Sequence, residues 1–88
     1  MIYRILTEER DNLAAIASRF FTGFNIGKLQ GYWEGTAEPS AVIEIDALGP
    51  DLRFETVDKV RALALLIKET NAQNAVLIQA IPAESKLV

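Results

Sequence analysis

Two adjacent aromatic residues, Tyr32 and Trp33, are the side chains of this chain best suited to hold a ligand. They stand between Gly31 and Gly35, and Trp33 is the only tryptophan. Neighbouring residues of a strand point to opposite faces, so one ring can enter the core while the other faces solvent or a ligand. Aromatic faces stack on flat rings, which contributes roughly 1–3 kcal/mol per nucleobase. The pair predicts a site for a nucleotide-like ligand. In the alternative packing role, Trp33 supplies core area and Tyr32 covers an edge.

Two cations and two polar residues complete the predicted ligand site. Lys28 and Arg4 would offset the charge of an anionic ligand if the sheet brings them near the aromatic pair. Glu38 and Ser40 would orient its polar groups. We expect this site beside the connection Gly35–Ser40, between two subunits.

Catalysis has few side chains available to it. The chain has no histidine and no cysteine, which excludes Ser–His–Asp and Cys–His mechanisms and histidine-bound metals. It also lacks G-x-G-x-x-G and P-loop motifs. Glu34 and Glu38 lie four residues apart across a predicted turn, and Glu44 and Asp46 share a strand face that could hold magnesium. Solvated carboxylates are the more common case, so we expect no metal, no cofactor and no enzymatic activity.

Length and composition limit the fold to one small domain. A chain of 88 residues buries a modest core, and without cysteine it has no disulfides to reinforce that core. Half of its residues are hydrophobic. A well-packed monomer is one interpretation. The composition favours a homodimer or higher homo-oligomer, because small domains often gain stability by association.

The charge balance narrows the choice of partners. The net charge is −3, with nine cations and twelve acids, and duplex nucleic acid is bound largely by cationic side chains. No apolar run reaches the length of a membrane span, and the first residues lack the pattern of a signal peptide. We therefore expect neither duplex nucleic acid nor a membrane as a partner, and we expect a cytoplasmic location.

The first half of the chain predicts a strand, a helix and a second strand. Ile2–Thr7 is rich in β-branched and aromatic residues. Thr7 would cap a helix with Glu8 in its first turn, and Gly23 would end that helix. Its apolar stripe has helical spacing and consists of Leu13, Ile16, Ala17 and Phe20.

A strand over Phe24–Glu34 follows. Glycine inside a strand often marks a bulge, so Gly27 and Gly31 predict a bulged or twisted second strand. Gly35–Ser40 is interpreted as a connection, with Pro39 as a breaker.

The second half predicts a strand, a helix and a last strand. In the strand Ala41–Asp46, Ala41, Ile43 and Ile45 share one face, and Glu44 and Asp46 lie on the other, so half of that other face should be solvated. Residues 48–54 contain a turn, Thr56 would cap a second helix, and Asn71 would end it. The buried stripe of that helix consists of Val60, Leu63, Ala64 and Ile67. Ala75–Ile81 is the last strand.

The order β-α-β-β-α-β predicts a ferredoxin-like α+β sandwich, as found in ACT-type domains, over residues 1–82. Right-handed crossovers place both helices on one face of a four-stranded antiparallel sheet. Residues 83–88 are expected to form a flexible tail. The other face has no helix to cover it and would mix Arg4, Leu6, Glu44 and Asp46 with part of the last strand. Such a face is a common place for pairing between copies.

Four segments together resemble small hypothetical proteins of phages and bacterial mobile elements. They are Tyr3-x-Ile5-x-Thr7-Glu8, Phe21-x-Gly23-Phe24, Gly31-x-Trp33-x-Gly35-x-x-Glu38-x-Ser40-x-x-Ile43-Glu44-Ile45 and Asn71-x-Gln73-x-Ala75-Val76-Leu77-Ile78. The resemblance covers nearly the whole chain. It implies a role in binding against host defence, which includes oligomeric sponges that sequester nucleotide signals.

Three function hypotheses follow. The first is a non-enzymatic homo-oligomer that binds a nucleotide-like ligand. The second is a protein-interaction module, an inhibitor or adaptor, that uses the open sheet face or an edge strand. The third is a small carboxylate-dependent enzyme that uses Glu38 and Glu44.

Overall fold

The computed structural model describes residues 1–47 and 53–88. The side chains of Trp33, Arg53 and Phe54 lie outside what it describes, and so does most of the predicted turn at 48–54. The elements follow the predicted order: β1 (Ile2–Glu8), α1 (Leu13–Ala17), β2 (Asn25–Trp33), β3 (Thr36–Asp46), α2 (Arg53–Thr70) and β4 (Leu77–Ile81).

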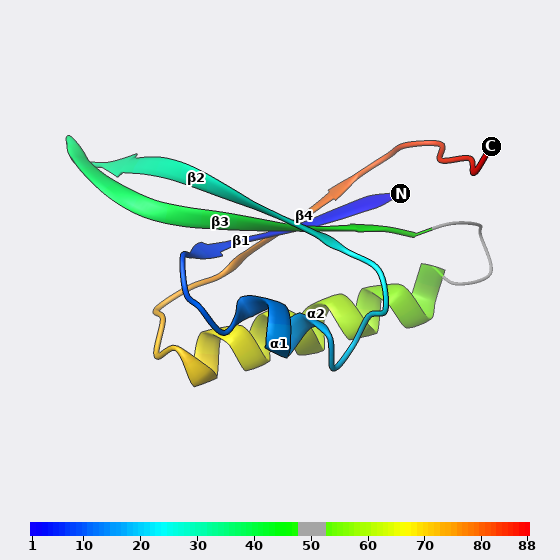
Figure 1. Ribbon diagram of the computed structural model, residues 1–88, viewed down its shortest axis with the longest axis horizontal. Helices are drawn as coiled ribbons and strands as arrows, with labels where there is room; N and C mark the ends of the chain where they lie inside the picture. Colours follow the sequence, from blue (N-terminus) through cyan, green and yellow to red (C-terminus); the bar gives the residue numbers. More distant parts are fainter. Residues whose placement is uncertain (48–52) are drawn as a thin grey trace.

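The four strands form one antiparallel sheet in the order β2-β3-β1-β4. Both helices lie against the same face of this sheet (Figure 1). The predicted ferredoxin-like α+β fold is thereby confirmed. We call the face without helices the open face.

The core lies between the sheet and the helices. Period-two alternation in β1 and β3 turns one apolar set of each strand toward the helices, and α2 meets them with residues at helical spacing. The fully buried side chains of this layer include Ile5, Ile43, Val60, Leu63 and Ile67. The predicted stripes of both helices supply most of the remaining core, although Phe20 is only partly buried.

The β2–β3 hairpin forms an arm that reaches beyond the helices (Figure 1). Its turn is Glu34-Gly35, with positive φ angles of 49° and 80°, as a type I′ hairpin turn requires. The predicted connection Gly35–Ser40 is therefore wrong, because β3 already begins at Thr36. Pro39 is tolerated there because it pairs with Gln30 at a position that, counted from the two-residue turn, makes no ladder hydrogen bonds with β2.

The expected bulge in β2 is also absent. In the β2–β3 hairpin, residues 25–33 pair one-to-one with residues 36–44. Gly27 has Val42 Cγ1 3.3 Å from the position that a Cβ would take, and Gly31 has Ser40 Oγ at 3.0 Å. These glycines allow close approach of neighbouring side chains without changing the register.

The start of α1 differs from the prediction. Glu8 ends β1, and α1 begins only at Leu13 after the N-cap residue Asn12. Thr7 is no helix cap: its side chain is buried, and its Oγ1 lies 2.7 Å from Nε2 and 2.9 Å from Oε1 of Gln73. Gly23 does not end the helix either, since the C-cap is Ser18.

In the second half, α2 ends at Thr70, as the predicted stop at Asn71 requires. It starts at Arg53, so Thr56 lies inside the helix and is not its cap. β4 starts at Leu77, two residues later than predicted. After β4, the carbonyl of Ala83 accepts a hydrogen bond from the N-terminal amine at 2.8 Å.

Candidate functional site

A row of four polar side chains crosses all four strands on the open face. The register aligns Arg4 of β1 with Gln79 of β4 on one side and with Glu44 of β3 on the other, and it aligns Glu44 with Asn25 of β2. We call Gln79, Arg4, Glu44 and Asn25 the polar row.

An ion pair forms the centre of the polar row. Arg4 Nε donates a hydrogen bond to Glu44 Oε2 at 2.6 Å, and the two side chains are 41% and 36% exposed. A charge-assisted bond between half-exposed groups typically contributes about 0.2–1 kcal/mol. The pair therefore neutralises two surface charges but adds little to the stability of the monomer.

Apolar residues lie on both sides of the polar row. One neighbouring row contains Leu77, Leu6 and Val42 and ends at Gly27 of β2. The row on the other side begins with Ile81 and Ile2, which are half-buried, and ends at Asp46. The missing side chain at position 27 leaves a hollow of about 380 Å³ that includes Leu6, Val42 and the polar row.

The open face combines apolar area with a central ion pair. Among the described residues, no group of three acidic side chains could hold a metal ion. The arginine of the hollow is already paired with a carboxylate. What remains is apolar area with matched donors and acceptors, which suits recognition of another surface.

The structure divides the residues of the predicted ligand site between the two faces of the sheet. Arg4 lies on the open face with its partner Glu44, and Ser40 and Glu38, four and six residues from Glu44, lie on the same side of β3. Lys28 and Tyr32 lie on the opposite face of β2, the one that continues the helix side. Of the two cations, Lys28 therefore shares a face with Tyr32, whereas Arg4 lies on the other face. The Trp33 side chain lies outside the described part of the structure.

Lys28 is already paired. Its Nζ lies 3.0 Å from Glu9 Oε1, and the Lys28 side chain is 82% exposed. The hydrogen bond and the charge of the Glu9 carboxylate raise the pKa of the Lys28 ammonium above its ordinary value. An anionic ligand would have to displace Glu9 to use this cation.

Tyr32 remains available on the arm. It is 70% exposed, and its hydroxyl accepts a hydrogen bond from Gln30 Nε2 at 3.1 Å. Its ring can stack without any rearrangement of the core. Stacking by Tyr32 or Trp33 stays a prediction.

The carboxylates proposed for catalysis lie too far apart for a shared reaction. Glu38 and Glu44 are six residues apart on the same face of β3, which corresponds to about 20 Å of extended chain. Glu34 lies in the hairpin turn. The Ser40 hydroxyl is close to Glu38, but it donates to the Glu38 backbone carbonyl at 3.4 Å.

Sequence reasoning missed two members of the polar row, Asn25 and Gln79. Gln79 is the polar exception in an apolar strand, which is a visible signal for its role. Asn25 has no such signal, because its neighbour in space is set by the β2–β3 register.

Comparisons with protein-family models and with curated proteins give no match for this chain. Within the described residues, no helix has the length and apolar character needed to cross a bilayer. A functional proposal for this chain therefore rests on the geometry of its sheet.

Proposed function

We propose that this protein acts by binding and not by catalysis, as a homodimer whose copies pack open face against open face. The observation that carries the proposal is the order of charges in the polar row, where Arg4 lies next to Glu44. A two-fold axis parallel to the strands, midway between β1 and β3, would set Arg4 of one copy against Glu44 of the other. The surface would then be complementary to itself, as an isologous interface must be.

The apolar rows support the same axis. It would set Leu6 of one copy against Val42 of the other and would bring β4 over β2. Leu77, which is 54% exposed, would then lie over Gly27 of the second copy. Sheets pack face to face about 10 Å apart, and the apolar area removed from water contributes about 25 cal/mol per Å².

Charge reversal tests this interface in solution. Glu44→Arg would set arginine against arginine at two symmetry-related places. Like-charge contacts in an interface cost several kcal/mol, so we expect dimerisation to weaken about 100-fold or more. Sedimentation velocity over a concentration series measures the monomer–dimer equilibrium directly.

The swapped double variant Arg4→Glu/Glu44→Arg is the matched control. It restores the alternation of charges, and we expect it to recover most of the dimer. Circular dichroism shows whether each variant is folded. A wild-type protein that stays monomeric at high micromolar concentration would overturn the proposal, and so would unchanged dimerisation of Glu44→Arg.

Binding of a nucleotide-like ligand on the arm is a second candidate function, favoured by the exposure of Tyr32. In this role the dimer would act as a sponge that sequesters a nucleotide signal. Stacking beside Trp33 should change its fluorescence, so a screen of cyclic and linear nucleotides tests the idea, with Tyr32→Ala as the control. An unchanged signal across the screen would argue against it.

A further inference from the structure

The outer edge of β4 differs from the other edge of the sheet. Among residues 1–47 and 53–88, β4 pairs only with β1, so one side of its backbone has no strand partner in the described part of the chain. Its five residues, Leu77–Ile81, include no charge and no proline, and Ile78 is 38% exposed. Natural proteins usually protect such an edge with a lysine, a proline or a bulge. β2 carries Lys28 on its edge, whereas β4 carries no such protection.

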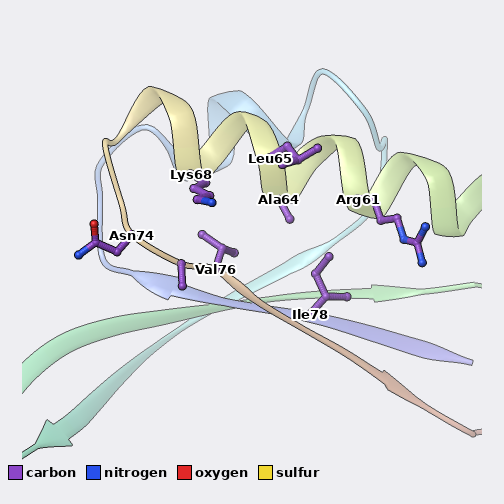
Figure 2. A pocket seen from close by; sticks show the side chains of 8 residues that line it. Arg61, Ala64, Leu65, Lys68, Asn74, Val76 and Ile78 are labelled. Carbon is purple, nitrogen blue, oxygen red and sulfur yellow. The ribbon is translucent and has the colours of Figure 1, made fainter.

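A groove runs beside this edge, between β4 and α2 (Figure 2). Its volume is about 370 Å³. The helix contributes four residues at positions i, i+3, i+4 and i+7, which lie on one helix face. They are Arg61, Ala64, Leu65 and Lys68. The strand side contributes Val76 and Ile78, so the floor is apolar.

Two cations flank the groove. Figure 2 shows Arg61 near Ile78 and Lys68 near Val76, at opposite ends. The four ion pairs in residues 1–47 and 53–88 involve other cations, so Arg61 and Lys68 have no carboxylate partner there. A protein with net charge −3 therefore carries a local pair of unneutralised positive charges beside an unpaired strand edge.

We infer that the β4 edge and the α2 groove bind an extended acidic segment of a partner protein by strand addition. The segment would add a fifth strand through backbone hydrogen bonds, as in other cases of β-augmentation. Its side chains at i, i+2 and i+4 would face the groove. An apolar residue at i+2 would fill the space over Ala64 and Ile78, and acidic residues at i and i+4 would pair with the two cations.

The spacing of the cations fits this pattern. Arg61 and Lys68 are seven helical residues apart, which is about 10 Å along the axis. Positions i and i+4 of a strand are about 13 Å apart, within reach of the long arginine and lysine side chains. Pairing with β4 of a second copy fits less well. Its two-fold axis would pass near Gln79, beside Ile78, and would bring the Arg61 residues of both copies together.

A labelled peptide, Thr-Glu-Thr-Leu-Thr-Glu-Thr, tests the proposal by fluorescence anisotropy. We expect saturable binding that weakens as salt is added, because the contacts are partly ionic. The double variant Arg61→Glu/Lys68→Glu should lose at least tenfold in affinity. Arg19→Glu/Lys86→Glu makes the same change in charge at exposed positions outside the groove and should bind like the wild type.

Two altered peptides separate strand addition from simple charge attraction. Replacing both glutamates by lysine should abolish binding. N-methylation of the backbone at the leucine and its neighbours keeps the charges but removes ladder donors, and should weaken binding at least tenfold. When the unmodified peptide binds, the backbone amide resonances of the protein that shift in the nuclear magnetic resonance spectrum should belong to residues 77–81.

Several outcomes would overturn the inference. These are no binding at millimolar peptide, equal binding of the lysine peptide, full binding of the N-methylated peptide, or amide shifts confined to the open face. Cross-links between β4 strands of two copies would assign the edge to self-pairing instead. The test is independent of open-face dimerisation, because Glu44→Arg leaves the groove residues intact and should bind the peptide normally.

Discussion

The two faces of the sheet come from the same strands but differ in burial. In β3, Ile43 faces the helices and is fully buried, whereas its neighbour Val42 faces the open side and is only partly buried. In β1, Ile5 and Leu6 show the same contrast. Alternation along a strand thus buries one face and leaves the other exposed for the packing that we propose. Substitutions on the two faces test how sharply stability divides between them.

The largest effect is expected for truncation of the helix-covered face. Ile43→Ala removes apolar atoms at the centre of the core and should cost about 2–5 kcal/mol in the free energy of unfolding, because a cavity remains. Val42→Ala, one residue away on the open face, should cost about 1 kcal/mol for its smaller loss of buried area. Urea denaturation at low protein concentration measures both in the monomer.

Equal costs for the two variants would show that the open face is as important for the monomer fold as the core. If Ile43→Ala does not fold, Ile43→Val provides the measurement. It should cost about 0.5–1.5 kcal/mol.

A polar pair on the helix-covered face should give the second largest effect. Gln73 is buried, its Oε1 accepts a hydrogen bond from the Glu8 backbone N–H at 3.2 Å, and its amide bonds Thr7. Gln73→Ala removes the bonds that Gln73 makes with the buried Thr7 and with the Glu8 N–H, and should cost about 1–3 kcal/mol. Gln79→Ala on the open face is the matched control, and should change monomer stability little. Thermal unfolding of both variants checks the difference.

The helix-covered face could be predicted well from the sequence, because its buried residues recur at spacings that are visible within each strand and helix. Ile43–Asp46 alternates apolar and acidic residues, and the stripe from Val60 to Ile67 has helical spacing, so their buried sides follow from period alone. Thr36–Ser40 was missed because Pro39 is typical of a connection. The two-residue turn at Glu34-Gly35 overrides that local preference by extending the antiparallel pairing.

The candidate site was predictable only in part, because its contacts depend on register. The sequence places Arg4 and Glu44 on the uncovered face, but only the β1–β3 alignment makes them direct neighbours. The sequence left open whether the sheet brings Lys28 and Arg4 near the aromatic pair, and the position of Lys28 on the other face depends on how β2 aligns with β3. The start of β1 at Ile2 was predicted, but the role of Thr7 could not be, since Thr7 finds its partner Gln73 66 residues away.

The Arg4–Glu44 pair should have a smaller effect on the monomer than the buried polar pair. A double-mutant cycle with Arg4→Ala and Glu44→Ala should give a coupling energy of about 0.2–1 kcal/mol at low protein concentration. At concentrations where open faces pack together, the pair would be desolvated and the coupling should rise. Concentration-dependent urea denaturation measures the coupling in both regimes. A coupling that does not change with concentration would argue against an open-face dimer.

The smallest effect is expected at Lys28, which lies on the helix side of the sheet but on the arm, beyond the cover of the helices. Its pKa is raised in the folded state by Glu9, so its contribution to stability is present at neutral pH and is lost as pH rises through the alkaline range above about 10.4. Because the side chain is 82% exposed, Lys28→Met should leave the thermal midpoint unchanged at neutral pH. Titration of the Lys28 side chain by nuclear magnetic resonance should give a lower pKa in Glu9→Gln. A clear loss of stability in Lys28→Met would contradict this expectation. It would mean that a residue on the helix side of the sheet stabilises the fold even where no helix covers it.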